Sequence, residues 1–171
     1  MASYLLIVGD RDALGWILTE SRTAFPSAGR TEVATLAKDD SLFLYTTRGC
    51  FKNPTRDRGR VIGTARVASD VRRLDKAVRF GERDFPVGCD LEIGPLAKFG
   101  EGVELQPLVE SLETFGHNSH AWSALLRRPM LLLTNGDASH LRKLLRTTTP
   151  TEDMDAYTRW WRASPRAGQP R

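Results

Sequence analysis

The sequence is poor in the residues that build disulfide scaffolds, signal peptides and membrane spans. It has two cysteines in 171 residues, and Cys50 and Cys89 lie far apart, which fits a reducing cytoplasm better than a disulfide scaffold. The apolar run Tyr4 to Val8 has no basic leader, and no later run approaches the roughly 18 apolar residues of a membrane span. We therefore expect a cytoplasmic protein that does not enter a membrane.

Motifs typical of enzymes are also scarce. The glycines form neither a dinucleotide-binding pattern nor a P-loop, and no Gly-x-Ser-x-Gly elbow is present. His117 and His120 could join the two cysteines as zinc ligands, but neither cysteine belongs to a close pair and this spacing is a weak indication. We therefore predict no catalytic residue, no metal and no cofactor.

The length and the 40% apolar content suit one globular domain with a proper core. We place this domain at residues 1–146. The remaining residues, 147–171, are rich in Thr, Pro, Arg and Gly, so we predict a basic, loosely ordered tail. Its aromatic residues Tyr157, Trp160 and Trp161 could dock back on the domain.

Charge is distributed unevenly along the chain. The net charge is +4, but the segment from Arg48 to Arg83 holds eleven Arg and Lys against four acids, whereas Asp84 to Glu113 holds seven acids and one Lys. Such asymmetry indicates that one face carries a positive field able to attract polyanions, nucleic acids among them. The alternative is that the cations are scattered over the exposed surface.

The first half of the sequence predicts a strand, a helix and two further strands. Tyr4 to Val8 is expected to be a buried strand, and Leu14, Ile17 and Leu18 follow at helical spacing. Asp12 is the expected N-cap of this helix, which would end before Phe25-Pro26. We expect the two further strands at Ser41 to Thr47 and Val61 to Ala68, with Gly63 as a bulge.

The second half predicts short strands mixed with short helices. Strands are expected at Asp90 to Ile93, Val103 to Leu105 and Met130 to Thr134, with a last helix at Ala138 to Leu145. Neither a regular strand and helix alternation nor internal repeats are present. This pattern indicates an α+β fold built on a small mixed β-barrel, and not a doubly wound sheet.

Aromatic and basic residues gather where the two central strands meet. The stretch 42–67 reads LFLYTTRGCFKNPTRDRGRVIGTARV, a strand, a cationic loop and a second strand. Aromatic rings next to hydrogen-bonding groups can hold an extruded base. Trp16 and Trp122 could equally be core residues on helices, and the Tyr45 hydroxyl could bond a backbone group.

Several short segments together resemble an EVE domain, a PUA-like relative of the YTH domain. The resemblance covers roughly residues 3–145 and is carried by YLLIVGD, DDSLFLYTTRG, VIGTARVASD, EGVELQPLVESL and HAWSALLRRPMLLLTNGDASHLRKLL. It departs from the family between the first helix and the Tyr strand, where Arg30 alone matches an Arg-Asn-rich segment, and after Tyr45, where Thr46 and Thr47 replace His-Ser. The resemblance implies a small PUA-like β-barrel flanked by helices that binds nucleic acid without catalysis.

The resemblance also implies which residues bind. We expect a base, itself modified, to enter an aromatic pocket formed by Trp16, Tyr45, Thr46, Phe51, His117, Asn118, Ser119 and Trp122. We expect the phosphates of DNA or RNA to contact Arg48, Lys52, Arg56, Arg58 and Arg60. Asn118 could instead be a turn residue or a helix cap.

Two alternatives remain open at this stage. One is a PUA-like enzyme that acts on a nucleotide or a small amide, which would need His117 or His120 beside an acid or a metal. The other is a protein-interaction module of a defence or modification system, with Trp160 and Trp161 of the tail as anchors for a protein partner.

Overall fold

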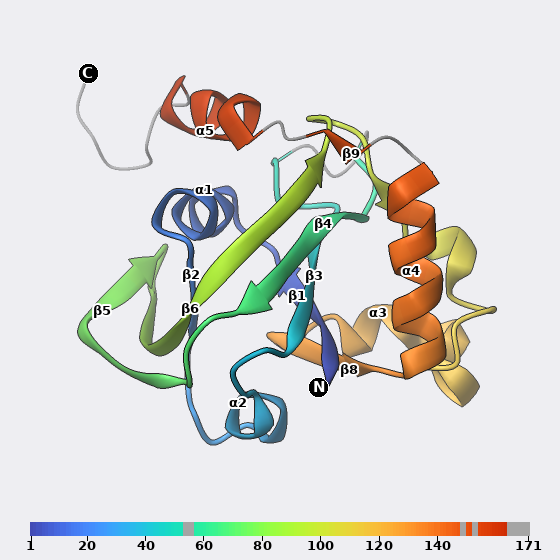
Figure 1. Ribbon diagram of the computed structural model, residues 1–171, viewed down its shortest axis with the longest axis horizontal. Helices are drawn as coiled ribbons and strands as arrows, with labels where there is room; N and C mark the ends of the chain where they lie inside the picture. Colours follow the sequence, from blue (N-terminus) through green and yellow to red (C-terminus); the bar gives the residue numbers. More distant parts are fainter. Residues whose placement is uncertain (53–56, 148–149, 152–153, 164–171) are drawn as a thin grey trace.

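The computed structural model describes residues 1–52, 57–147, 150–151 and 154–163. A strongly curled mixed sheet forms its centre, with short helices around it (Figure 1). The strands are β1 (Ser3–Val8), β2 (Arg22–Phe25), β3 (Ser41–Thr46), β4 (Arg60–Val67), β5 (Arg72–Phe80), β6 (Arg83–Ala97), β7 (Val103–Glu104), β8 (Met130–Leu133) and β9 (Pro150–Thr151). The α-helices are α1 (Arg11–Glu20), α2 (Thr31–Thr35), α3 (Trp122–Leu125), α4 (Asn135–Thr147) and α5 (Met154–Ala163), and η1 (Gln106–Leu108) and η2 (Gly116–Ala121) are 3-10 turns. The predicted α+β class with a small mixed β-barrel is confirmed.

The sheet curls into a barrel that stays open along one side. The strand order is β2-β6-β4-β3-β1-β8, in which β1 and β3 are parallel and the other neighbours are antiparallel. Within the described residues, β2 is paired only with β6, so the order begins at β2 and ends at β8 without closing. We call the gap between β2 and the end of β1 the open seam.

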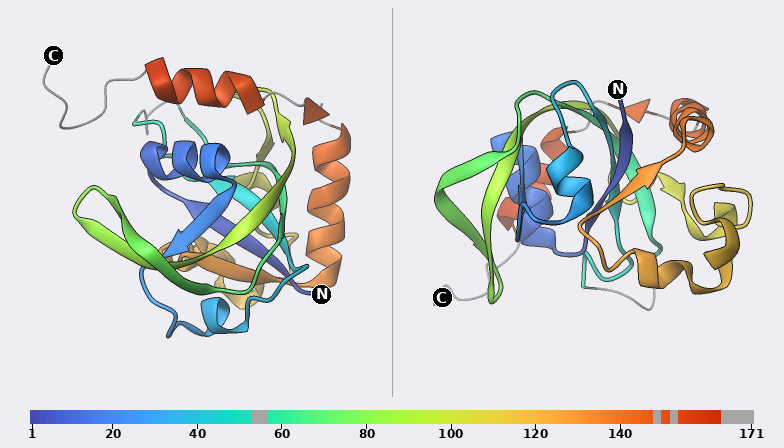
Figure 2. Two further views of the ribbon diagram at one scale, coloured as in Figure 1. Left: turned by 60° about the vertical axis from the view of Figure 1, so that its left-hand side comes forward. Right: turned by 90° about the horizontal axis from the view of Figure 1, so that it is seen from below.

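Both faces of the central strand β3 are buried, which explains why its sequence is a continuous apolar run. Leu42 and Leu44 face a core beneath α1 and α5, whereas Phe43 and Tyr45 face a second core beneath α4. The two helical layers lie on opposite sides of the sheet in both views (Figures 1 and 2). No helix of the described part is long and apolar enough to cross a membrane.

The predicted bulge at Gly63 is confirmed. The register of β4 shifts against β6 between Gly63 and Ala65, and that of β3 against β4 shifts at Leu44 and Tyr45. A Cβ at Gly63 would lie 2.7 Å from the carbonyl oxygen of Pro95, closer than any side chain tolerates. Glycine at this position therefore lets β6 cross close to β4.

The first helix begins and ends earlier than its sequence predicted. Asp10, not Asp12, is the N-cap, because its Oδ1 accepts hydrogen bonds from the backbone N–H of Asp12 (2.8 Å) and of Ala13 (3.2 Å). The helix ends at Glu20, where Ser21 adopts φ 52°. The chain then forms the short strand β2, which the sequence analysis had assigned to the helix or to its end.

A long hairpin that the sequence analysis did not assign projects from the sheet (Figure 2). Its strands β5 and β6 pair antiparallel, and Phe80 lies opposite Arg83 across a two-residue turn. Gly81, the first residue of this turn, has φ +60°, a conformation that glycine adopts without strain. The hairpin carries so many charges that it lacks the apolar alternation of an ordinary strand.

Part of the segment expected to be a loosely ordered tail forms α5, which lies beside α1 (Figures 1 and 2). The buried Tyr157 donates a hydrogen bond to the carbonyl oxygen of Ala97 at 2.9 Å. The indole N–H of Trp161 donates to Oδ1 of Asp12 at 3.2 Å. These contacts hold α1 between the sheet and α5, so the predicted docking is confirmed for Tyr157 and Trp161. The side chain of Trp160, the third residue of that prediction, lies outside the part that the structure describes.

Replacing Gly15 on α1 should weaken the packing of α5 on α1. A Cβ at Gly15 would overlap the ring of Trp161. In a free helix Gly→Ala is favourable by about 1 kcal/mol, but here overpacking should lower the free energy of unfolding by about 1 to 3 kcal/mol. Urea denaturation measures this change.

The matched control is Gly49→Ala, because a Cβ at Gly49 meets nothing within 4 Å. In a Trp161→Ala background, Gly15→Ala should no longer destabilise the protein, since the clash is removed. An unfolding free energy of Gly15→Ala equal to or above that of the wild type would contradict the packing of α5 on α1.

Candidate nucleic-acid interface

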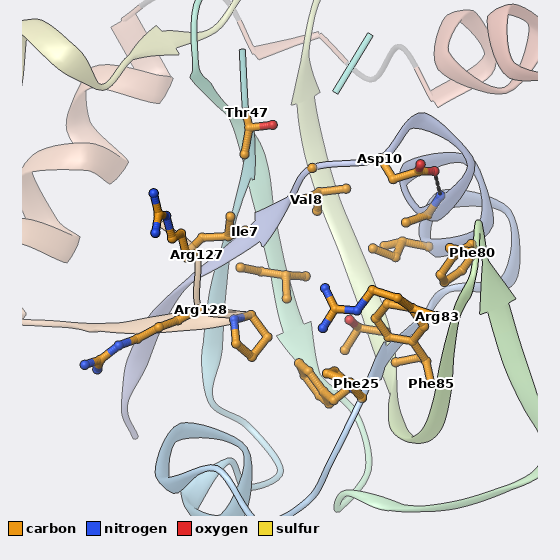
Figure 3. Close-up of a pocket in the computed structure, with 18 of the residues that line it drawn as sticks. Ile7, Val8, Asp10, Phe25, Thr47, Phe80, Arg83, Phe85, Arg127 and Arg128 are labelled. Atoms are coloured by element: carbon orange, nitrogen blue, oxygen red, sulfur yellow. Dashed lines mark hydrogen bonds between the residues drawn. The ribbon is translucent and has the colours of Figure 1, made fainter. Parts of the chain in front are cut away.

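A cavity of about 360 Å³ occupies the open seam (Figure 3). Its volume lies within the range of small-molecule sites, about 300 to 1,000 Å³. Its walls come from the end of β1, the start of α1, strand β2, the tip of the β5–β6 hairpin and the segment before β8. The lining residues are Leu6, Ile7, Val8, Gly9, Asp10, Ala13, Trp16, Ile17, Thr23, Ala24, Phe25, Pro26, Arg30, Thr47, Phe80, Arg83, Phe85, Leu126, Arg127, Arg128 and Pro129. We call this space the seam cavity.

Aromatic rings form one wall of the seam cavity. The ring of Phe80 lies edge-to-face against Trp16, with centroids 5.9 Å apart, and against Phe85 at 5.2 Å. Phe25 is fully buried beside them. Because each ring is held by another in a favourable edge contact, the wall is preorganised as a stacking surface.

Arginines surround the cavity and one reaches into it. The guanidinium of Arg83 extends from the hairpin into the cavity in Figure 3, and its Cζ lies 5.8 Å from the ring centroid of Phe85. Arg128 pairs with Glu32 at 2.9 Å. In the described part of the chain, Arg30, Arg83 and Arg127 have no carboxylate partner. These three cations outnumber the one carboxylate of the cavity lining, that of Asp10, and give the mouth a net positive field.

Strand β2 has an edge whose backbone groups are not paired with β6. The carbonyl oxygen of Ser21 accepts a bond from the N–H of Leu91 at 2.8 Å. Since paired residues alternate along an antiparallel ladder, Thr23 and Phe25 also direct their backbone groups toward β6. The N–H and C=O of Ala24 then point away from β6, on the side where Ala24 lines the cavity. This N–H donor and this C=O acceptor can form hydrogen bonds with polar groups on the rim of a flat ring.

The structure does not bring the eight predicted base-pocket residues into one cavity. Trp16 lines the seam cavity, but Tyr45 is buried in the core beneath α4. Trp122 packs in the same core, edge-to-face on Phe115 at 6.1 Å. Three more, His117, Asn118 and Ser119, lie on the turn η2, and Thr46 and Phe51 line a second cavity. The predicted convergence is therefore wrong in its geometry, because Tyr45 and Trp16 face opposite sides of the sheet.

Asn118 is a turn residue. This was the alternative to its predicted role in the base pocket. Its backbone N–H donates to the carbonyl oxygen of Phe115 at 2.8 Å, and its own φ and ψ of −102° and 19° interrupt the turn η2. Its side chain and that of His117 are exposed. A contact between this turn and a base stays a prediction.

Four of the predicted residues meet at a second, smaller cavity of about 190 Å³. Thr46, Phe51, Arg58 and Arg60 line it together with Asp57, Phe99 and Tyr157. Arg60 is committed within the protein, since its Nη1 donates to the carbonyl oxygen of Gly100 at 2.8 Å and its Nη2 lies 3.6 Å from Glu104.

The remaining phosphate-binding candidates lie on the loop after β3. Arg48 and Lys52 are exposed there, and Arg56 lies outside the described residues. Arg48 directly follows Thr47, which lines the seam cavity, so its backbone stands beside the cavity mouth. Phosphate binding by this loop stays a prediction.

The zinc alternative finds no support in the geometry. Cys50 and Cys89 are buried free thiols, and burial, followed by the nearby carboxylates, raises the pKa of each. Such thiols resist deprotonation and are poor metal ligands or nucleophiles. Over residues 1–52, 57–147 and the short described segments that follow, His, Cys, Asp and Glu form no group of three that could hold a metal ion.

The hairpin residues Phe80, Arg83 and Phe85 of the cavity wall were not predicted from the sequence. A signal was present: Phe80-Gly81-Glu82-Arg83 places a glycine-led pair between two short runs, which is a hairpin pattern. Val78, Phe80 and Phe85 mark the apolar face, but the charges between them hid it. Phe25 was also overlooked, because its segment was read as a helix end.

Comparison with known proteins finds relatives by structure alone. No family model and no curated protein matches the sequence. The solved structures that share the fold include Rpa0253 from Rhodopseudomonas palustris, with a TM-score of 0.55, 13% identity, and coverage of 87% of this chain and 96% of that one. The Mmi1 YTH domain, solved in complex with RNA, has a TM-score of 0.57 and 13% identity over 85% of this chain and 78% of its own. The chain has the fold of the YTH domain.

A further structure extends this YTH-like fold to a protein solved with DNA. Human THYN1 in complex with DNA containing 5-methylcytosine matches with a TM-score of 0.50 and 10% identity, over 84% of this chain and 97% of that one. At these identities the comparison concerns the fold. The PUA-like fold expected from the resemblance to EVE domains is confirmed.

The buried position of Tyr45 predicts a pH dependence of stability. Burial raises the pKa of Tyr45 to about 12, from about 10 in the unfolded chain. The folded form therefore binds a proton that the unfolded form has lost between pH 10 and 12, and stability falls over this range. A difference of two pKa units between the folded and the unfolded chain corresponds to a loss of about 2 to 3 kcal/mol in the free energy of unfolding.

Tyr45→Phe should reduce this alkaline loss by that amount when the free energy of unfolding is measured between pH 9 and 12. A variant whose stability falls as steeply as that of the wild type would show that the Tyr45 phenol ionises freely and lies outside the core.

Proposed function

We propose that this chain is a noncatalytic nucleic-acid-binding domain that accepts one extruded base in the seam cavity. The observation that carries the proposal is the aromatic wall of Trp16, Phe80 and Phe85 beside the guanidinium of Arg83, at the open seam of the sheet. The shared fold supports it, because an Mmi1 YTH domain was solved with RNA and THYN1 with DNA containing 5-methylcytosine.

The chemistry of the cavity suits a base better than a sugar or a peptide. Flat rings stack on aromatic side chains, each contact contributing about 1 to 3 kcal/mol. A cation held over an aromatic ring, as Arg83 is held by Phe85, adds a second planar surface. The outward backbone groups of β2 offer one donor and one acceptor to the edge of the ring.

Phosphates would be held at the mouth. Arg30 and Arg127 lack carboxylate partners among the described residues and come from two different segments around the cavity. Arg48 on the neighbouring loop extends the same positive field. Contacts of this kind fix a strand in place without reading its sequence, so they suit DNA and RNA alike.

The protein partner expected at the tail has less support. Trp161 packs on α1 and donates to Asp12, which makes it part of the domain and not a free anchor. We retain the nucleic acid as the proposed partner and the cytoplasm as an expectation.

Truncating Trp16 should show whether the base binds in the seam cavity or in the pocket predicted from the sequence. Trp16→Ala removes the ring that supports Phe80 and should weaken binding of an oligonucleotide with an extruded base about five- to hundredfold. Trp122→Ala, the matched control, removes a half-buried indole from the opposite core and should leave affinity within twofold. Fluorescence anisotropy with labelled oligonucleotides measures both, after circular dichroism has established that each variant is folded. Equal losses in the two variants would contradict the seam cavity as the binding site.

Removing the cations at the mouth of the seam cavity should change the salt dependence of oligonucleotide binding. Arg30→Gln and Arg127→Gln should each lower the slope of log affinity against log salt by about 1 and weaken all sequences alike. Arg79→Gln is the control, since Arg79 lies beside Asp84 at 4.0 Å, on the hairpin face away from Phe80. Binding should be titrated between 50 and 200 mM salt. A slope that falls only for Arg79→Gln would place the phosphates on the other side of the hairpin.

A further inference from the structure

The smaller cavity of about 190 Å³ is a separate space from the seam cavity. Its walls come from the loop after β3, the start of β4, the end of β6 with the turn that follows it, and α5. We call it the α5 cavity. Thr46 lines the α5 cavity and the next residue, Thr47, lines the seam cavity, but the two cavities share no lining residue in the described part of the chain.

The lining of the α5 cavity includes Asp57, whose carboxylate is incompletely paired. Its Oδ2 is buried and, among the described residues, is the one buried side-chain oxygen or nitrogen without a hydrogen-bond partner. An unpaired buried carboxylate is unfavourable for folding, so such a group in a native structure calls for a ligand or another specific reason. The α5 cavity is the space beside Asp57 in which a hydrogen-bond donor fits.

The backbone near Asp57 is held in place by the barrel. A Cβ at Gly59 would overlap the hydroxyl of Tyr45, so the chain passes close against this buried ring. The carbonyl oxygen of Gly59 also accepts a hydrogen bond from the N–H of Leu105 at 3.1 Å. Asp57 is only two residues from this fixed point, which limits how far its carboxylate can move.

Three aromatic rings line the same cavity. Phe99 lies edge-to-face against Phe51, with ring centroids 5.7 Å apart, and against Tyr157 at 5.2 Å. The hydroxyl of Tyr157 donates to Ala97, so Tyr157 offers its ring to a ligand. Phe99 is 37% exposed and therefore borders the opening. Aromatic rings beside a carboxylate attract an organic cation, because ring faces carry negative charge.

The charges of the lining also favour a cation. Arg60 is compensated within the protein, since its Nη2 lies 3.6 Å from Glu104. Arg58 is exposed, so its guanidinium can extend into water. Asp57 and Glu101 then place two carboxylates against one uncompensated arginine.

We propose that the α5 cavity binds a methylated ammonium group, as carried by a methylated lysine side chain or a small alkylamine. The volume lies below the range of about 300 to 1,000 Å³ for whole small molecules and suits the end of a side chain. Asp57 accepts a hydrogen bond from the ammonium N–H, and the methyl groups lie against the aromatic rings. This site is additional to the proposed base site in the seam cavity and does not depend on it.

The two parts of the lining together select a dimethylammonium group. Its one N–H donates to Asp57, and its two methyl groups contact the rings. A trimethylammonium group has no N–H and leaves Oδ2 of Asp57 unpaired. An unmodified ammonium has donors but is strongly hydrated and gains less from the rings. We expect a preference of about three- to tenfold for the dimethyl form over either of the others.

The test titrates ¹⁵N-labelled protein with N-acetyl-lysine methylamide that carries zero, two or three methyl groups on Nζ. The dimethyl probe should shift the backbone amide signals of Thr46 and Glu101, at the α5 cavity, and leave that of Ala24, at the seam cavity, in place. Its affinity should be about three- to tenfold above that of the other two. Tighter binding of a dimethyllysine peptide than of the isolated residue would identify a peptide as the source, and equal binding a small amine.

Two variants test the groups that make the site. Asp57→Asn should weaken binding of the dimethyl probe about tenfold or more. Its free energy of unfolding should equal or exceed that of the wild type, because an unpaired buried charge is removed. Phe99→Ala truncates a partly exposed ring and should weaken binding about two- to tenfold. The matched control is Asp75→Asn, which removes an exposed carboxylate of β5 and should change neither quantity.

Several outcomes would overturn the proposal. Equal affinity of the wild type and Asp57→Asn would exclude a role for the carboxylate, and a loss of stability in Asp57→Asn would show that it serves the fold. An oligonucleotide that displaces the dimethyl probe from the α5 cavity would assign this space to nucleic acid. Trp16→Ala should leave binding of the dimethyl probe unchanged, so a failure of this proposal is distinguishable from a failure of the base site.

Discussion

The arrangement of this domain depends on the absence of strand pairing between β2 and the end of β1 in the described structure. A curled sheet that closed here would be a filled small barrel. Because β2 pairs only with β6 in the described structure, its outer edge stays unpaired and its backbone groups face a cavity instead of another strand. An unpaired edge is ordinarily a liability. Here α1 and the hairpin tip cover the unpaired edge of β2, and their residues line a cavity where a further strand would otherwise pair.

The two helical layers have different tasks around this sheet. On one side, α4 covers the core that contains Phe43 and Tyr45. On the other, α1 carries Trp16 into the cavity wall and is itself held down by α5 through Trp161. A segment distant in sequence thus holds the helix that carries an aromatic ring of the cavity wall.

The sequence predicted the parts of the fold whose patterns are strong and local. The strands β1, β3, β4 and β8 are continuous or alternating apolar runs, and Gly63 marked its bulge because a side chain cannot fit beside β6. The hairpin escaped prediction because charge masked its period of two. The start of α1 was placed two residues late because Asp10 and Asp12 are both good caps. The candidate site could not be located, since the side of the sheet on which Tyr45 lies depends on register across four strands. Aromatic content alone does not contain that information.

The hairpin that walls the cavity has a consequence for how such a domain diversifies. Phe80 and Arg83 face each other across a two-residue turn, and no residue of β5 belongs to the buried core. Substitutions at the tip can therefore exchange a ring for an amide, or a cation for an acid, with little effect on folding. The barrel core can therefore stay the same while residues at the tip of the β5–β6 hairpin change, and with them the ligand that the cavity accepts.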